Sequence, residues 1–369
     1  MTERVPFMTL APRSDAAAIR AAIDRVIDRG WFILGPELTA FEEEFAAASG
    51  ARFAVGVGTG TDAIALTLRA LGIGPGDEVI TSPLSAAFSA LAITMAGATP
   101  VFADIDASRL TLDPNAAAAA ITSRTAGILP VHLYGQPADM PAFTALASRH
   151  GLALIEDACQ AHLATSAAHA VGTFGAAGAF SFYPTKNLGA LGDAGAAVTD
   201  DAALADRIRR LRNGGQAERY DHKTFGVNSR LDEMQAAILR ARLPDLRGWT
   251  ARRRELAARY RRDLAGAPFT VPSEHESGHV YHLFPVLVAD RAAFQRHMAD
   301  EGIGTLVHYP IALPDQDAFR SSPASDCPIA RRVAAEVCSL PLHPFLSDPE
   351  ADLVSAAARG WAPATVRRS

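Results

Sequence analysis

Short apolar runs alternate with alanine-rich stretches between residues 53 and 200. The apolar runs are rich in β-branched or aromatic residues and read, in order, FAVGV, EVITSP, TPVFADI, TAGILPVHLYG, LALIEDA, GAFSFYP and GAAVTDD. The stretches between them have helical patterns. Strands that alternate with helices are typical of crossover units, so the sequence predicts an α/β fold with a mainly parallel sheet between layers of helices.

The pattern changes beyond this region. A long helical stretch is predicted from about residue 229 to 264, with a break near Pro244. Two further apolar runs, VYHLFPVLVAD and GIGTLVHYP, follow with helical patterns between them. We therefore expect a large α/β domain over residues 1–245 and a smaller α+β domain over residues 246–369, on which the N-terminal segment could pack.

Composition and charge argue against several classes of partner. The 369 residues are 49% hydrophobic and 20% charged, with a net charge of −5. The most basic run, ARRRELAARYRRDL, has apolar residues at helical spacing, so no nucleic-acid or anionic-membrane surface is expected. The uncharged stretch 84–103 divides into a helical pattern and the strand-like TPVFADID, so it is not expected to span a membrane.

The cysteines and the N-terminus favour a cytoplasmic protein. Cys159, Cys327 and Cys338 cannot all pair and lack the spacing of metal ligands, which fits a reducing compartment and no bound metal. The N-terminal residues MTERVPFMTLAPRSD carry charge where a signal peptide needs an unbroken apolar core.

Polar and ionisable side chains follow several of the predicted strands. Asp157 lies near the end of the run LALIEDA, Gln160 follows it, and Lys186 is the one cation in GAFSFYPTKNLGALGDAG. Ligands of open α/β sheets bind at the carboxyl ends of the strands, so these side chains could converge on one crevice. A lysine in such apolar surroundings is costly to bury as ammonium, so Lys186 is either an ordinary surface charge at a turn or a nucleophile.

Two nearby motifs have two interpretations each when taken alone. In IEDACQAH, Asp157 could cap a helix, or it could keep a pyridine nitrogen protonated while Gln160 reaches a second polar group. In GVGTGTDAIAL, the turn before the helix could be structural, or its backbone N–H groups and the Thr59 and Thr61 hydroxyls could bind phosphate. Together with Lys186 they supply what pyridoxal 5′-phosphate needs: an anion cradle, a carboxylate and a lysine for the aldehyde.

With these motifs in place, the sequence resembles a known family, the sugar aminotransferases of the DegT/DnrJ/EryC1/StrS type within the fold type I aspartate aminotransferase superfamily. The resemblance covers nearly the whole chain. Its most specific parts, in order, are GTDAIALTLRALGIGPGDEVI, PVHLYGQPADM, IEDACQAH, FSFYPTKNLGALGDAGAAV and FGVNSRLDEMQAAIL. It implies a seven-stranded, mainly parallel sheet between helices, a smaller C-terminal α+β domain and pyridoxal 5′-phosphate as the cofactor.

The resemblance implies a role for each matching position. Lys186 would bond to the cofactor aldehyde and move the substrate proton, and Asp157 would face the pyridine nitrogen. The other implied contacts are Gln160 with the ring hydroxyl, Ser181 and the turn of Gly60, Thr61 and Asp62 with the phosphate, and Asn228 with the phosphate of the neighbouring subunit's cofactor. A homodimer with shared active sites is therefore implied.

The substrate is also implied by the resemblance. The family transfers an amino group, usually from L-glutamate, to a nucleotide-linked keto-hexose in amino-sugar biosynthesis. FYPTKNLGALGD resembles members that aminate carbon 3, whereas members acting on carbon 4 more often have a histidine before the lysine and a TTGEGG-like sequence after it. The substrate-side candidates are Tyr183, His308 and Tyr309, with Tyr281 and His282, although either His–Tyr pair could equally pack the small domain.

Two positions are ambiguous within the family pattern. Arg230 is either a contact for a substrate carboxylate or a structural ion pair with a nearby acid. Family members often stack an aromatic residue on the cofactor ring from a threonine–aromatic pair, but Ser85 and Ala86 stand at these positions here. Phe88 could substitute for the missing aromatic residue.

Other functions stay open on the sequence alone. They are a 4-keto-sugar aminotransferase, a non-catalytic regulatory protein that binds pyridoxal phosphate, and an NAD-dependent oxidoreductase, whose glycine fingerprint is absent. A related subgroup that removes a sugar hydroxyl has histidine in place of the lysine, and Lys186 argues against it.

Overall fold

A seven-stranded sheet forms the centre of the larger part of the molecule. The structure, a computed structural model, describes residues 4–363. The strand order is β1-β9-β8-β5-β4-β2-β3, and only β9 runs antiparallel to its neighbours. The strands are β1 (Phe53–Val57), β2 (Glu78–Thr81), β3 (Thr99–Phe102), β4 (Thr125–Leu129), β5 (Ala153–Asp157), β8 (Ala177–Ser181) and β9 (Gly195–Thr199). The predicted α/β fold with a mainly parallel sheet is confirmed.

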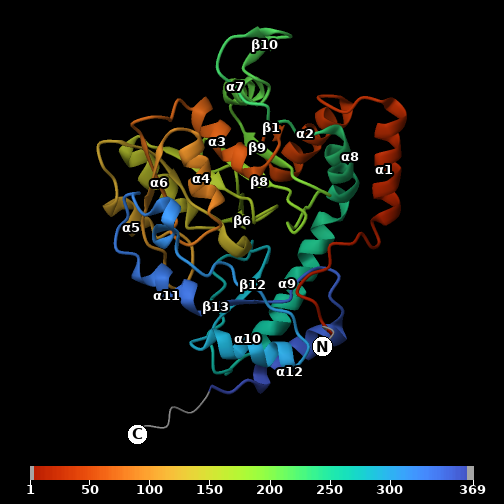
Figure 1. Ribbon diagram of the computed structural model, residues 1–369, viewed down its shortest axis with the longest axis vertical. Helices are drawn as coiled ribbons and strands as arrows, with labels where there is room; N and C mark the ends of the chain where they lie inside the picture. The colour runs from red at the N-terminus through yellow and green to blue at the C-terminus, as the bar shows by residue number, and fades with distance from the viewer. Residues whose placement is uncertain (1–3, 364–369) are drawn as a thin grey trace.

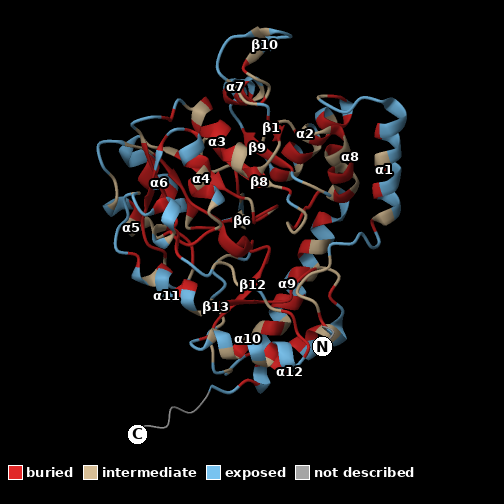
Figure 2. Cartoon of the chain, viewed as in Figure 1, coloured by how far each residue is buried: buried red, intermediate tan, exposed pale blue. Residues whose placement is uncertain are grey.

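Helices cover both faces of this sheet (Figure 1). Alternate strand residues face opposite layers, as the two-residue period of a strand requires, so Ile155 and Leu154 of β5 lie in different apolar clusters. Helices α3 (Gly60–Ala70), α4 (Phe88–Met95) and α7 (Ala202–Arg212) share the cluster of Ile155. On the other face lie α2 (Pro36–Ser49), α5 (Pro114–Ala119), α6 (Met140–His150) and α8 (Glu233–Arg242). Figure 2 shows the sheet buried between them.

A buried carboxylate fixes the start of α2. The Glu233 side chain accepts hydrogen bonds from the backbone N–H groups of Gly35, Glu37 and Leu38 at 2.8–2.9 Å. A Cβ atom on Gly35 would lie 2.7 Å from Glu233 Oε2, so only glycine fits there. These bonds satisfy N–H groups that a helix N-terminus otherwise leaves without partners. They explain the glutamate of the motif SRLDE, to which the sequence analysis assigned no role.

The second half of the chain forms a smaller α+β part. The predicted break at Pro244 is confirmed, because a short 3-10 turn separates α8 from α9 (Leu246–Asp263). The antiparallel pair β12 (Phe284–Leu287) and β13 (Val337–Leu340) packs with α10 (Arg291–Asp300), α12 (Asp348–Gly360) and α9. Val5 joins the same cluster, and its backbone pairs with Ile303. We propose the domain boundary at residues 245/246 on this basis.

The segment GIGTLVHYP differs from its strand-like pattern. It makes only isolated bridges, at Ile303 with Val5 and at Leu306 with Ser339. Beyond Leu306 the chain leaves the β13 edge, so that His308 and Tyr309 line a large cavity instead of continuing a ladder. The second strand of this part is supplied by β13, which the sequence analysis did not identify.

The remaining elements lie at the periphery. α1 (Ala16–Arg29) packs on α8, and α11 (Pro328–Glu336) lies beside β12. The hairpin of β10 (Gln216–Glu218) and β11 (Asp221–His222) projects from the body beyond α7 (Figure 1). The uncharged stretch 84–103 contains α4 and β3, as expected. Within residues 4–363, no helix is both long enough and apolar enough to cross a bilayer.

Candidate active site

A cavity of about 840 Å³ lies at the carboxyl ends of the central strands. Asp157 ends β5, Ser181 ends β8, and the turn between β1 and α3 supplies Gly60. The N-terminal segment and the chain around His308 line it from the side of the smaller part. These side chains therefore converge on one cavity at the carboxyl ends of the strands, as predicted.

Lys186 lies in this cavity, in a turn that follows β8. Its backbone N–H donates to the carbonyl of Tyr183 at 2.8 Å. The neighbouring Asn187 is buried, and its side-chain amide donates to the carbonyl of Val280 at 3.0 Å. The chain has only one other lysine, Lys223, which pairs with Asp221 in the exposed hairpin. Lys186 is therefore the one lysine amine available to the cavity.

Burial controls the protonation of the groups that line the cavity. It lowers the pKa of Lys186 from the ordinary value of 10.5, an effect that nearby Cys159 and Asp157 oppose. Burial and the charge of Lys186 lower the pKa of His308 to about 4, so its imidazole is neutral at pH 7. Burial raises the pKa of Tyr309 to about 12, so its hydroxyl stays protonated. An amine with a lowered pKa is more readily neutral and nucleophilic.

The Asp157 carboxylate is held on both oxygens. Its Oδ2 accepts a hydrogen bond of 2.6 Å from the Ser89 hydroxyl, and its Oδ1 accepts one of 3.1 Å from the backbone N–H of Cys159. Asp157 is only 5% exposed, and it lines the cavity. No helix begins after it, because residues 158–164 form turns, so the helix-cap interpretation is wrong. Ser89 was missed by the sequence analysis, although a lone hydroxyl in an apolar helix start was a usable signal.

Gly60 brings the start of α3 against the end of β8. A Cβ atom on Gly60 would lie 2.7 Å from both Ser181 Cβ and Cys159 Sγ, so no side chain fits there. Among the described residues, no hydrogen bond engages the backbone N–H groups of Gly60 and Thr61. They lie at a helix N-terminus beside the Ser181 hydroxyl, an arrangement that suits a phosphate group.

Asp62 does not fit the predicted phosphate contact. Its backbone N–H donates to Thr59 Oγ1 at 3.0 Å, and its carboxylate accepts from the hydroxyls of Thr59 and Ser229 at 2.9 and 2.8 Å. Both groups are therefore occupied in capping α3 and holding Ser229, and Asp62 lies outside the cavity lining. We leave Asp62 out of the proposed cradle for this reason.

A hydrogen-bond network joins Gln160 to the substrate-side candidates. Gln160 Oε1 accepts from the backbone N–H of Tyr134 at 2.7 Å, and its amide donates to the Tyr309 hydroxyl at 3.2 Å. The Tyr134 hydroxyl donates to the carbonyl of His308 at 2.5 Å. His308, Tyr309 and Tyr183 all line the cavity. The network fixes the chain around His308 against the large domain.

Asn228 and Arg230 lie outside the cavity of their own chain. Asn228 is exposed, as a residue that reaches a neighbouring subunit must be. Arg230 donates to the side chain of Asn213 at 3.3 Å. No ion pair of Arg230 occurs in residues 4–363, so the predicted ion pair with an acid is replaced by this bond to an amide.

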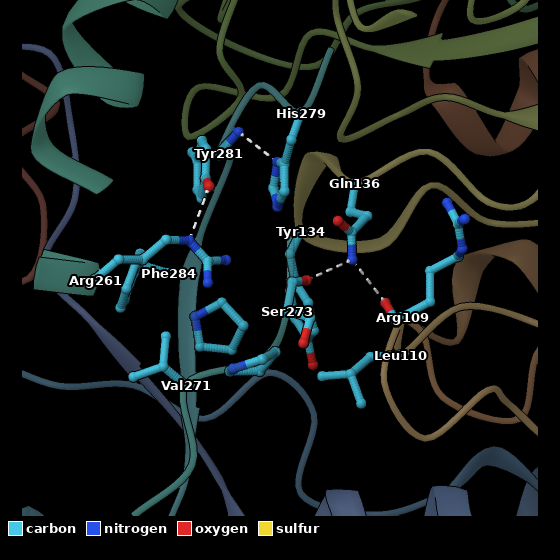
Figure 3. A pocket seen from close by; sticks show the side chains of 12 residues that line it. Arg109, Leu110, Tyr134, Gln136, Arg261, Val271, Ser273, His279, Tyr281 and Phe284 are labelled. Carbon is cyan, nitrogen blue, oxygen red and sulfur yellow. Dashed lines mark hydrogen bonds between the residues drawn. The ribbon is translucent and has the colours of Figure 1, made fainter. Parts of the chain in front are cut away.

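Tyr281 and His282 separate into two environments. His282 lines the large cavity and contacts Asn187 Oδ1 through Nδ1 at 3.3 Å. Tyr281 instead lines a small pocket of about 20 Å³, where it stacks on His279 and accepts from Arg261 Nε at 3.1 Å (Figure 3). Of the two interpretations of Tyr281, a substrate contact or packing in the small domain, the structure supports packing.

No aromatic residue stands at position 86, where family members often have the residue that stacks on the cofactor ring. Ala86 and Phe88 both line the cavity, and Phe88 is 62% exposed. The role of Phe88 as the stacking residue stays a prediction.

A buried histidine–glutamate hydrogen bond supports the site from behind. The rings and carboxylates of His132 and Glu156 are fully buried, with His132 Nε2 3.1 Å from Glu156 Oε2. Glu156 also accepts from the backbone N–H groups of Gly172 and Phe174 at 2.8 and 2.7 Å. The pair fixes the strand that ends in Asp157. The sequence alone does not reveal this pair, because the two residues are 24 positions apart and meet only in the folded structure.

Comparison with known sequences identifies relatives along nearly the whole chain. The model of the DegT/DnrJ/EryC1/StrS aminotransferase family matches residues 13–359. The chain is 48% identical over 370 residues to the dTDP-3-amino-3,4,6-trideoxy-alpha-D-glucose transaminase of Streptomyces venezuelae, covering 98% of this chain and 97% of that protein. It is 43% identical over 356 residues to the UDP-N-acetyl-3-dehydro-alpha-D-glucosamine 3-aminotransferase of Acidithiobacillus ferrooxidans, covering 95% and 96%.

Solved structures show the same fold. A crystal structure of S. venezuelae DesV in complex with a ketimine intermediate matches with a TM-score of 0.95 and 48% identity, over 98% of this chain and 99% of that chain. The structure of NtdA from Bacillus subtilis with the bound cofactor PMP matches with a TM-score of 0.90 and 33% identity, over 97% of this chain and 85% of that chain.

The lowered pKa of Lys186 gives a test of its burial. Between this lowered pKa and 10.5, the unfolded chain binds a proton at Lys186 that the folded chain does not, so this group costs stability at neutral pH and the cost fades as the pH rises. We expect Lys186→Met to stabilise the cofactor-free protein more at pH 7 than at pH 10, measured by urea unfolding. Lys223→Met, in the exposed hairpin, is the control and should show no such pH-dependent gain. Equal effects of Lys186→Met at both pH values would mean that the buried amine stays charged.

Proposed function

This chain belongs to the DegT/DnrJ/EryC1/StrS aminotransferase family, and we propose that it transfers an amino group from L-glutamate to carbon 3 of a nucleotide-linked keto-hexose. The observation that carries this proposal is the position of Lys186, the one lysine of the cavity, beside Asp157 at the carboxyl edge of the sheet. Aminotransferases of this family depend on pyridoxal phosphate, and NtdA was crystallised with its aminated form, PMP.

The residues present fit pyridoxal 5′-phosphate. The free N–H groups of Gly60 and Thr61 and the hydroxyl of Ser181 supply donors for a phosphate, in a place where a Cβ atom on residue 60 would fill the space. Asp157 supplies a carboxylate for a pyridine nitrogen, and the Gln160 amide supplies a donor for a ring oxygen. We assign these residues and Lys186 to the cofactor.

The proposed chemistry is a proton transfer by Lys186. When bound, the cofactor supplies an aldehyde for the amino group and a ring that takes up an electron pair. The Lys186 amine, whose pKa is lowered by burial, removes the proton from the donor carbon and returns one to the acceptor carbon. Asp157 keeps a counter-charge close to the ring.

The two relatives support carbon 3 as the acceptor position. Their names describe a 3-amino sugar in one case and a 3-dehydro sugar in the other, linked to dTDP or UDP. The sequence FYPTKNLGALGD around Lys186 agrees with this assignment. His308, neutral at pH 7, and the protonated Tyr309 are proposed as hydrogen-bonding partners of the sugar, and the exposed Tyr183 as a third.

We propose a homodimer with shared active sites. Asn228 is exposed and does not line the cavity of its own chain. It directly precedes Ser229, whose hydroxyl bonds to Gly58 and Asp62 at the start of α3. The projecting hairpin carries Tyr220, 79% exposed, and the segment that follows it carries Phe225, 92% exposed, while Trp31 and Phe32 are more than half exposed elsewhere. Aromatic side chains of this size in the open are typical of surfaces that a partner covers. A second copy of the chain would bury them and bring Asn228 to the neighbouring site.

The first test is the identity of the product. The purified protein is incubated with L-glutamate, pyridoxal phosphate and a panel of nucleotide-linked 3-keto and 4-keto hexoses. We expect a 3-amino sugar, identified by mass spectrometry and NMR, and no product with Lys186→Ala. A 4-amino product would reassign the acceptor carbon, and the absence of turnover on every ketone, with the cofactor bound, would favour the regulatory alternative.

The second test concerns the shared site. Lys186→Ala and Asn228→Asp are each expected to be inactive, the second because its added charge repels the phosphate. After subunit exchange of an equal mixture, roughly a quarter of wild-type activity should return, because half the dimers are mixed and each has one intact site.

The matched control mixes Lys186→Ala with Asp157→Asn. Both residues belong to the same chain's site, so no mixed dimer has an intact site and no activity should return. A monomer in sedimentation at micromolar concentration, or no recovery in the first mixture after proven exchange, would rule out the shared site.

A further inference from the structure

Two serine hydroxyls lead from the cavity wall to the Asp157 carboxylate. Ser89 Oγ lies 2.6 Å from Asp157 Oδ2, and Ser85 Oγ lies 3.2 Å from Ser89 Oγ. Ser85 and Ser89 are buried, at 3% and 2% exposure respectively, and both line the large cavity. Neither hydroxyl has a role in the function proposed above.

The direction of the hydrogen bonds follows from counting protons. An ionised carboxylate has no proton to donate, so Ser89 must donate to Asp157. The 2.6 Å length is that of a charge-assisted O–H···O⁻ bond. A hydroxyl has one proton, so the contact between the two serines requires Ser85 to donate to Ser89. The chain of donors therefore runs Ser85 to Ser89 to Asp157.

Such a chain alters the carboxylate at its end. Each donated bond spreads the negative charge and makes the carboxylate a weaker base. Ser89 is a stronger donor when it accepts from Ser85, because successive hydrogen bonds polarise one another. Cys159 N–H on Oδ1 adds a second donor at 3.1 Å. Asp157 still has free lone pairs, and its place in the cavity lining leaves them open to a ligand.

We propose that Ser85 and Ser89 are positioning residues that keep the proton of the Asp157–pyridine hydrogen bond on the ring nitrogen. The inference rests on the proposed cofactor role of Asp157. With both hydroxyls present, the negative charge of the carboxylate is already engaged by donated hydrogen bonds, and the proton stays on the nitrogen. Without them, the proton moves towards Asp157, and the ring loses the positive charge that lets it take up electrons.

The test uses ¹⁵N NMR of the intact enzyme loaded with pyridoxal phosphate labelled at the ring nitrogen. The ring ¹⁵N shift reports protonation directly and does not depend on turnover. We expect Ser89→Ala to move the shift towards that of neutral pyridine, with Ser85→Ala moving it less and Asp157→Asn moving it furthest. Turnover of Ser89→Ala should fall about tenfold or more, as for a lost hydrogen bond to a charged group. Ser89→Thr keeps the hydroxyl and should restore the wild-type shift.

The matched control is Ser82→Ala. Ser82 is equally buried in the same segment, but its hydroxyl bonds only to the backbone of Leu84, at 3.0 and 3.2 Å. Its ring ¹⁵N shift should equal that of the wild type. A wild-type shift in Ser89→Ala while Asp157→Asn moves it would overturn the serine chain and leave the function intact, as would an equal movement in Ser82→Ala. No ring-protonated resonance in the wild type would overturn the role of Asp157 itself.

Discussion

The burial of the Lys186 amine is the constraint on which the rest of the site depends. An ammonium in an apolar cavity is costly, and the lowered pKa of Lys186 shows that cost. The chain must therefore hold a flexible side chain in an unfavourable place. It does so from both sides: Asn187 is bonded to Val280, and Leu191 donates to Gln235 on α8 at 2.9 Å. The lysine turn is thus fixed to both parts of the molecule.

The sheet was predictable because its information is local. Each of the seven apolar runs became one strand, since an apolar run between helical patterns can be buried only between two helix layers. The smaller part was harder to predict. β13 is a short apolar run that forms a strand because it pairs with β12. GIGTLVHYP has a strand-like pattern, but it forms no regular strand, and its residues His308 and Tyr309 line the cavity. Whether each of these segments forms a strand depends on pairing with distant residues, which a local sequence pattern does not reveal.

The same division applies to the site. Lys186, Asp157 and Gly60 were identified from their motifs because each lies at the end of a strand or in the segment that directly follows one. Their supports were not identified. Ser89 reaches Asp157 across 68 positions, and Glu233 bonds to Gly35 across 198. Asp62 was assigned to the phosphate because sequence position cannot tell whether its N–H is free or already bonded to Thr59. The role of a residue such as Asp62 can be assigned only from the folded structure, because it depends on which hydrogen bonds its groups already make.

The central claim is that Lys186 is the group that bonds to the cofactor, and the chain's composition makes it directly measurable. Borohydride reduction of the cofactor-loaded protein fixes the cofactor to its amine, and peptide mass spectrometry locates it. With only two lysines, 186 and 223, the outcomes are well separated. The account predicts a phosphopyridoxyl group on the peptide that contains Lys186 and an unmodified Lys223. Label on Lys223 or on the N-terminal amine, with Lys186 unmodified, would contradict it.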